Sequence, residues 1–116
     1  MKCFADRRLL RMTERHGLKV STAKASNGAE GEKQLAFGIS IGMRMWEEQP
    51  GEEKPESVRE YETVGYVVRG SAQLEVNGQT LDLKAGDSWL VPKGARHRYR
   101  ILEPLTAIEA TSPPQH

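Results

Sequence analysis

The chain has 116 residues, of which 37% are hydrophobic and 28% are charged, so it can form one core and is too short for two ordinary domains. No apolar run approaches the roughly 20 residues of a transmembrane helix. Its 17 basic and 16 acidic residues leave a net charge of +1, which lacks the basic excess of a nucleic-acid-binding protein. We therefore expect one soluble domain with neither a membrane nor a nucleic-acid partner.

Residues 1–17 carry charges throughout and lack the apolar stretch and cleavage site of a secretory signal, so we expect a cytoplasmic protein. The apolar residues of this extension fit neither a helical nor a strand period, and residues 18–23 are a candidate first strand. The single cysteine, Cys3, cannot form an intrachain disulfide or begin a paired-cysteine zinc site. His16 and His116 have no partners in the sequence, and we expect both to be exposed.

In residues 35–45 every second side chain is apolar, which predicts one half-buried strand. The apolar positions are Leu35, Phe37, Ile39, Ile41, Met43 and Met45. We expect this stripe to pack, with Gly38, Gly42 and Arg44 on the other face. Residues 47–56 are polar and contain two prolines and a glycine, which predicts a loop.

Shorter strand signals follow at intervals of about eight to twelve residues, a spacing typical of a β-sandwich or barrel. They lie at 66–69, 72–76, 80–83, 88–91, 97–102 and 105–110. Between two of them, Asn77-Gly78 predicts a type I′ hairpin turn, because both central residues of that turn need positive φ. Residues 111–116 contain two prolines and no core residue, which predicts an extended tail. The fold class is therefore all-β.

The most specific pattern runs from Gly86 to His97 and reads Gly-Asp-Ser-Trp-Leu-Val-Pro-Lys-Gly-Ala-Arg-His. It resembles the second conserved motif of the cupin superfamily, and Tyr-Val-Val-Arg-Gly at 66–70 resembles the end of the first motif. The resemblance covers residues 45–110. It implies a single small jelly-roll β-barrel over 1–116, with residues 1–17 as an extension and 111–116 as a tail. Small cupins commonly dimerise, so the resemblance also implies a homodimer.

Cupins usually bind a divalent metal through two histidines and a glutamate of the first motif and a histidine of the second. By the family's spacing, the first three positions fall on Ser57, Arg59 and Thr63, and only the last, His97, is present. The later asparagine position of the second motif falls on Ile101. An arginine at a metal position repels a divalent cation. We therefore expect no metal of the usual cupin kind and no other cofactor.

Strand alternation around the motif histidine puts His97, Tyr99 and Ile101 on one face and the three arginines of 96–100 on the other. We expect the first face to line the barrel and the arginines to form a solvated stripe that pairs with acidic residues. A histidine inside a barrel can bind a ligand or transfer a proton near neutral pH. The alternative interpretation is a buried histidine that makes one hydrogen bond and has no further role.

If the same alternation holds along the first motif, four side chains point inward opposite the histidine: Ser57, Arg59, Tyr61 and Thr63. Hydroxyls with a guanidinium suit a small carboxylate, phosphate or polyol-like ligand. The candidate ligand-binding residues are Ser57, Arg59, Thr63, His97 and Tyr99. Trp46 and Trp89 are interpreted as core or dimer contacts.

A single β-bulge in this segment would exchange its faces, turning Glu60 and Glu62 inward and Arg59 outward. The two carboxylates and His97 would then form an oxygen-rich metal site. This register stays open as an alternative at the level of the sequence.

Three functions follow from these residues. The first is binding of a small anionic or polar molecule in the barrel, without a catalytic metal. The second is a metal-independent isomerase or lyase in which His97 is the general base and Tyr61 or Tyr99 the acid. The third is a metal-dependent cupin enzyme with a non-standard site, against which the missing ligands argue. No motif in the chain identifies the ligand.

Overall fold

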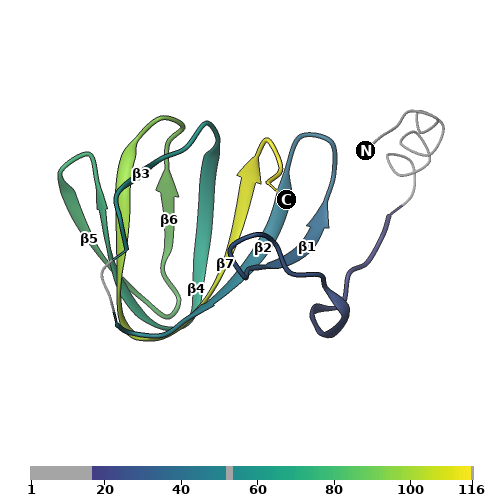
Figure 1. Cartoon of the computed structure of the whole chain (residues 1–116), viewed down its shortest axis with the longest axis horizontal. Helices are drawn as coiled ribbons and strands as arrows, with labels where there is room; N and C mark the ends of the chain where they lie inside the picture. The colour runs from purple at the N-terminus through teal and green to yellow at the C-terminus, as the bar shows by residue number, and fades with distance from the viewer. Residues whose placement is uncertain (1–16, 52–53, 116) are drawn as a thin grey trace.

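The computed structural model describes residues 17–51 and 54–115 and is built almost entirely from antiparallel β-strands (Figure 1). The elements are a short 3-10 helix, η1 (Thr22–Lys24), and the strands β1 (Lys33–Phe37), β2 (Gly42–Glu48), β3 (Ser57–Val58), β4 (Glu62–Val76), β5 (Gln79–Lys84), β6 (Ser88–Val91) and β7 (Arg96–Ser112). The candidate strand at 18–23, left open by the sequence, is not formed, and η1 begins at Thr22 instead. Cys3, His16 and His116 lie outside the described residues.

Two long strands, β4 and β7, organise the barrel. They pair from Glu62 opposite Ser112 to Val76 opposite His97. Each has different neighbours along its length: β6 and then β5 lie beside β4, while β3 and then β2 lie beside β7. This exchange of neighbours curves the sheet on itself, and the all-β jelly-roll barrel is confirmed (Figure 1). Within residues 17–51 and 54–115, no helix is long and apolar enough to span a membrane.

The bend in both long strands is made by β-bulges rather than by turns. The pairing register shifts three times between Val67 and Ala72, and a bulge bends a strand without ending it. The segments predicted as separate strands at 66–69 and 72–76 are therefore one strand, and so are 97–102 and 105–110. At the bend, Gly70 has a φ of +89°, and a Cβ there would clash with the carbonyl oxygen of Pro104. Only glycine fits this close approach of the two strands.

The hairpin between β4 and β5 has the predicted geometry. Asn77 and Gly78 have φ angles of +47° and +82°, as a type I′ turn requires. The turn sets a register in which Leu74 lies opposite Leu81. The sequence prediction is confirmed here because the turn geometry depends only on these two residues.

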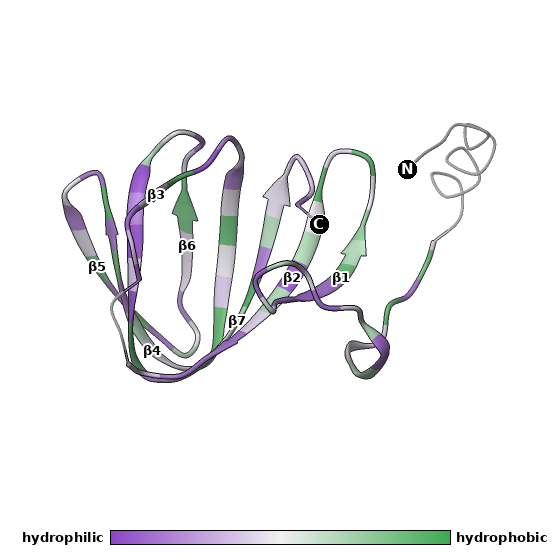
Figure 2. Cartoon of the chain, in the orientation of Figure 1, coloured by the Kyte–Doolittle hydropathy of each residue, from purple (hydrophilic) through white to green (hydrophobic). Residues whose placement is uncertain are grey.

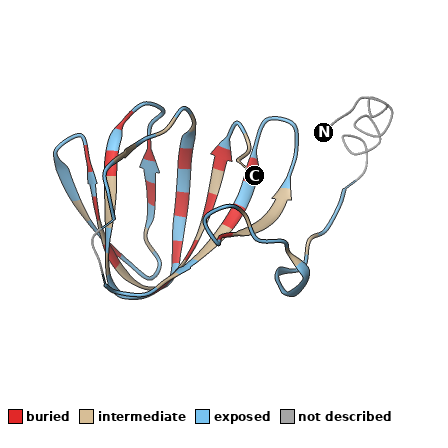
Figure 3. Cartoon of the chain, viewed as in Figure 1, coloured by how far each residue is buried: buried red, intermediate tan, exposed pale blue. Residues whose placement is uncertain are grey.

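The prediction for residues 35–45 is wrong in two respects. The segment forms β1, a turn and β2, with the turn closed by a 2.7 Å hydrogen bond from Gly38 N–H to the Ile41 carbonyl. In β2 the polar residue Arg44 is buried, whereas Met43 is 41% exposed. Figures 2 and 3 show that the hairpin connection is hydrophobic yet exposed. Alternation identified the two faces correctly, but the barrel interior contains a polar cavity here and the apolar face lies outside.

The core lies between the two walls of the barrel and is seen as the buried bands that alternate with exposed or intermediate ones along β4 and β7 (Figure 3). It comprises Val67, Ala72, Leu74, Val76, Leu83, Trp89, Val91, Ala95, Leu105 and Ala107. Thr111 is also only 1% exposed. The prediction of a tail without buried residues is therefore wrong at Thr111, because β7 continues to Ser112.

Candidate functional site

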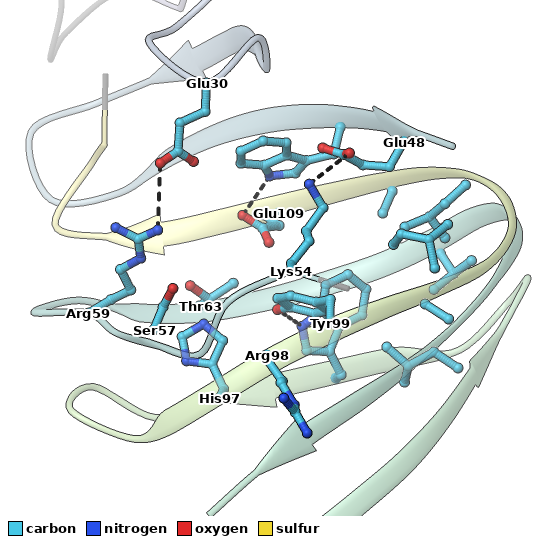
Figure 4. A pocket seen from close by; sticks show the side chains of 18 of the residues that line it. Glu30, Glu48, Lys54, Ser57, Arg59, Thr63, His97, Arg98, Tyr99 and Glu109 are labelled. Carbon is cyan, nitrogen blue, oxygen red and sulfur yellow. Dashed lines mark hydrogen bonds and ion pairs between the residues drawn. The ribbon is translucent and has the colours of Figure 1, made fainter. Parts of the chain in front are cut away.

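A cavity of about 350 Å³ lies inside the barrel, a volume typical of small-molecule sites (Figure 4). Part of its lining is apolar and belongs to the core: Val67, Ala72, Leu83, Trp89, Ile101, Leu105 and Ala107. Most of the rest is polar or charged and comes from β2, β3, β4 and β7, from the segment between β3 and β4, and from the segments that precede β1 and β3. The barrel cavity can therefore hold a molecule with an apolar body and a polar edge.

The side chains of residues 57–63 alternate between the cavity and solvent, as predicted for this segment without a β-bulge. Ser57, Arg59, Tyr61 and Thr63 all line the barrel cavity. Val58, Glu60 and Glu62 are exposed instead. Pairing of β3 with β7 puts Ser57 directly opposite His97, and Figure 4 shows Ser57 and Thr63 beside the histidine ring. The bulged register is wrong, so Glu60 and Glu62 form no metal site with His97.

His97, the central residue of the second motif, is 8% exposed and has a fixed orientation. Its Nδ1 lies 3.0 Å from the carbonyl oxygen of Ala95. Because a carbonyl can only accept, this contact puts a proton on Nδ1, and in the neutral ring Nε2 then carries the lone pair and is the nitrogen available to the cavity. The structure places Tyr99 and Ile101 on the same face, as predicted.

Tyr99 lies next to the histidine and is held by a tryptophan. Its ring contacts that of His97 edge to face, with centroids 5.8 Å apart, and Trp89 Nε1–H donates to its hydroxyl at 3.0 Å. Burial, followed by the negative charge of Glu109, raises the pKa of Tyr99 above its usual value. Tyr99 is therefore a neutral phenol near pH 7, and its own O–H remains able to donate.

A buried arginine on β2 forms a polar network that the sequence interpretation missed. Arg44 Nε donates to Glu109 Oε1 at 2.9 Å, and its Nη2 donates to the Tyr61 hydroxyl at 3.1 Å. Trp46 Nε1–H donates to the same Glu109 oxygen at 3.0 Å. The guanidinium also stacks near the Trp46 and Tyr61 rings, at 5.1 and 5.5 Å from their centroids.

The network keeps Arg44 charged. Burial opposes the charged guanidinium, but the Glu109 carboxylate and the Tyr61 hydroxyl outweigh it, so the pKa of Arg44 is raised above its usual value. One sequence signal pointed to this network. Glu109 continues the inward stripe of Leu105 and Ala107 on β7, so extending the alternation along this strand would have placed a carboxylate inside the barrel.

Arg59 lies at the edge of the cavity rather than deep beside the histidine. Its side chain is 41% exposed, and its Nη2 is 3.6 Å from Glu30 Oε2 (Figure 4). A second lining pair joins Lys54 to Glu48 at 2.9 Å. The acidic residues that line the cavity are thus each paired with a cation.

Two arginines of the predicted stripe pair with acidic residues. Arg96 lies 3.4 Å from Glu56, and Arg98 lies 2.8 Å from Glu75. Arg98 also contributes to the cavity lining, which strand alternation did not predict.

The four positions where a cupin usually holds its metal carry Ser57, Arg59, Thr63 and His97. Residues 17–51 and 54–115 contain no group of three histidine, cysteine or acidic side chains that could hold a metal ion. A divalent cation is normally bound by imidazole, thiolate or carboxylate groups, and a guanidinium opposes it. The residues present therefore do not fit a metal of the usual cupin kind.

Comparison with known proteins supports the same fold. The sequence model of the Cupin domain family matches residues 44–110. The RmlC-like cupin from Shewanella frigidimarina NCIMB 400 is 22% identical, with 87% of this chain and 95% of that chain covered at a TM-score of 0.76. KdgF from Halomonas sp. is also 22% identical, covering 86% of this chain and 96% of that chain at a TM-score of 0.74.

The Cnp3 cupin domain of Schizosaccharomyces pombe is 17% identical, with 84% of this chain and 74% of that chain covered at a TM-score of 0.71. At such identities the likeness concerns the fold alone. No curated protein matches the chain.

Proposed function

Because this chain belongs to the cupin domain family, with the barrel but not the usual metal ligands, we propose that it binds a small molecule bearing an anionic or polar group in the barrel cavity. The observation that carries the proposal is the convergence of Ser57, Arg59, Thr63, His97 and Tyr99 on that cavity. All five are hydrogen-bonding groups, and they come from two separate stretches of the chain, residues 57–63 and 97–99. A cavity with such convergent polar groups and an apolar remainder is the usual form of a ligand site.

Arg59 is the residue proposed to bind an oxyanion. Its contact with Glu30 is long, at 3.6 Å, and both side chains are about half exposed, so the pair contributes little stability. A carboxylate or phosphate of the ligand can replace Glu30 and take two hydrogen bonds from the guanidinium. Arg44 is less suited to this role, because Glu109 and Tyr61 already occupy its Nε and Nη2.

The remaining groups fit the uncharged part of the ligand. Ser57 and Thr63 supply hydroxyls that can donate or accept, the Tyr99 phenol can donate, and His97 Nε2 can accept. Several neighbouring ligand hydroxyl or carbonyl groups would satisfy this set. The preferred ligand is therefore a small hydroxylated or oxo acid rather than a simple inorganic anion.

The test is calorimetric titration and thermal shift with a panel of small carboxylates, phosphorylated compounds and neutral polyols. We expect saturable binding of hydroxylated acids, weakened about tenfold in Arg59→Ala, on the scale of one charge-assisted hydrogen bond. Arg100→Ala is the matched control, since Arg100 is exposed and does not line the cavity. Binding that survives Arg59→Ala unchanged, or that Arg100→Ala weakens equally, would refute the role of Arg59.

A metal-independent isomerase or lyase is the second candidate, favoured by the orientation of the histidine. With Nδ1–H held by Ala95, Nε2 can remove a proton from a bound substrate. Tyr61, hydrogen-bonded by Arg44, or Tyr99, hydrogen-bonded by Trp89, can return a proton. Turnover of a bound acid, measured at saturating substrate, that is lost in His97→Ala would establish this activity.

Metal content is tested separately. Protein purified without chelator should contain less than stoichiometric divalent metal by elemental analysis, with the same content in His97→Ala. Stoichiometric metal in the wild type that disappears in His97→Ala would overturn the metal-free proposal.

A further inference from the structure

One oxygen of the Glu109 carboxylate is hydrogen-bonded inside the protein and the other is not. Arg44 Nε and Trp46 Nε1–H both donate to Oε1, at 2.9 and 3.0 Å. Within residues 17–51 and 54–115, no hydrogen bond reaches Oε2. The same residues contain no unpartnered side-chain oxygen or nitrogen that is sealed from solvent. Oε2 therefore borders the open space of the barrel cavity, which Glu109 lines.

This oxygen needs a hydrogen-bond donor. The Glu109 side chain is only 9% exposed, and the oxygens of a carboxylate so deeply buried are normally hydrogen-bonded. As a carboxylate paired with Arg44, the group can only accept. A ligand in the cavity can supply the missing donor.

Gly65 makes room beside Glu109 on the inner face of the sheet. Strand pairing puts Glu109 of β7 opposite Gly65 of β4, and Gly65 opposite Trp89 of β6, so the three residues share one face. A Cβ at Gly65 would clash with the Trp89 ring, so the indole occupies the space over the glycine. From there its Nε1–H reaches the Tyr99 hydroxyl at 3.0 Å. The absent side chain thus puts this hydroxyl on the same inner wall as Glu109.

The Tyr99 hydroxyl has the opposite requirement. An indole N–H only donates, so the Tyr99 oxygen accepts from Trp89 and its own O–H is left to donate. In the part of the chain that the structure describes, residues 17–51 and 54–115, no acceptor takes this proton. Figure 4 shows the Glu109 carboxylate and the Tyr99 hydroxyl facing the same part of the cavity. After burial, the charge of Glu109 is the next cause that raises the pKa of Tyr99, as expected of neighbouring groups.

We propose that Glu109 and Tyr99 select the ligand by a hydroxyl group that donates to Glu109 Oε2 and accepts from the Tyr99 O–H. An alcohol does both with one oxygen, whereas an oxo group only accepts and an ammonium group only donates. The selection rests on the proposed function, in which the acid group of the same ligand binds Arg59. It narrows the ligand to a hydroxy acid and makes Glu109 a specificity-determining residue.

Binding to the wild type tests the selection without any substitution. The probes are hydroxypentanoates, the matching oxopentanoates and pentanoate itself, compared by calorimetric titration. We expect the best hydroxypentanoate to bind about tenfold or more tightly than its oxo counterpart and than pentanoate, on the scale of a hydrogen bond to a charged group. Equal affinities for the three forms would overturn the selection alone. If no acid bound at all, the proposed function would fail with it.

Glu109→Gln changes one atom of the site. Its amide oxygen can keep the hydrogen bonds from Arg44 and Trp46, while an NH2 group takes the place of Oε2, so a donor replaces the acceptor. Both a hydroxyl and an oxo group can accept from this donor. The preference for hydroxypentanoate over oxopentanoate should therefore be lost. A folded Glu109→Gln that keeps the wild-type preference would refute the role of Glu109.

Glu32→Gln is the matched control. Glu32 Oε2 lies 3.9 Å from Arg44 Nη1 and its side chain is 6% exposed, but Glu32 does not line the cavity. The substitution removes the same charge from beside the same arginine and should leave the hydroxyl preference unchanged. Equal loss of the preference in Glu32→Gln and Glu109→Gln would assign it to the charge around Arg44 and overturn the contact at Oε2.

Tyr99→Phe tests the second partner of the hydroxyl. Removal of its O–H should weaken the best hydroxypentanoate about tenfold. Unchanged affinity would exclude Tyr99 from the selection. Circular dichroism and thermal unfolding establish that each variant is folded, and the wild-type comparison decides the selection even where a variant does not fold.

Discussion

Arg44 Nε lies 2.9 Å from Glu109 Oε1 inside the barrel, although 65 positions separate the two residues in the sequence. Both side chains are about nine-tenths buried. The pair joins β2 to β7 at the wall of the cavity, next to the Tyr61 and Trp46 side chains. Of the ion pairs that line the cavity, it is the most buried. Each member supplies the opposite charge that the other needs in this buried position.

Arg44→Met should destabilise the protein by about 3–5 kcal/mol, because it leaves the Glu109 carboxylate buried without its partner. Urea unfolding followed by circular dichroism measures the change. The double variant Arg44→Met/Glu109→Leu removes both charges and should recover much of the lost stability. A double variant that is no more stable than Arg44→Met would contradict this account of the pair.

Glu30→Gln should strengthen binding of anionic ligands about two- to fivefold, because Glu30 competes with the ligand for Arg59. Titration with a hydroxylated acid that binds the wild type measures the change. Glu56→Gln is the matched control, since Glu56 pairs with Arg96 and does not line the cavity. Equal effects of the two substitutions would indicate a general charge effect and count against competition at Arg59.

Tyr99 should make stability fall with pH in the alkaline range. Its pKa is raised in the folded protein, first by burial, so above the usual tyrosine pKa of about 10 the unfolded chain loses this proton before the folded one does. The contribution of the Tyr99 phenol to the free energy of unfolding is fully present below that pH and is lost as the pH rises toward the raised pKa of the folded state. Denaturation midpoints of Tyr99→Phe should decline less steeply over the same range.

Ultraviolet absorbance of tyrosinate provides an independent check on Tyr99. The absorbance difference between the wild type and Tyr99→Phe reports the ionisation of Tyr99. It should increase only at pH values above the usual pKa range of tyrosine. A difference that titrates within the usual range would show that burial does not protect the phenol.

Gly70→Ala should be strongly destabilising, by about 3 kcal/mol or more, because it combines a positive φ with a clash against the Pro104 carbonyl. Gly86→Ala separates the two effects. Gly86 has a φ of +95°, but an added Cβ would meet no atom within 4 Å, so this change should cost only about 1 kcal/mol. Thermal unfolding of both variants tests the difference, and equal losses would mean that the close approach at Gly70 is unimportant.

Local features of the fold were predictable from the sequence because each depends on a few neighbouring residues. The Asn77-Gly78 turn needed only two residues that accept positive φ, and the alternation of His97, Tyr99 and Ile101 needed only the period of a strand. The motif from Gly86 to His97 predicted the family and the barrel. The strand breaks at 69–72 and 102–105 were misread because a bulge and a turn interrupt alternation in the same way.

The sequence by itself therefore determined that the chain is an all-β cupin barrel, and which side chains of each strand share a face. It did not determine which face of β2 lies inside, since the same alternation is compatible with an apolar stripe that packs in the core and with one that is exposed outside. Only the tertiary structure decided that Arg44 faces inward, because that orientation depends on Glu109 of β7 and on Tyr61, which the fold brings together from distant positions. The tertiary structure likewise decided that Arg59 lies at the cavity edge, because the fold brings Glu30 from a distant position to its guanidinium.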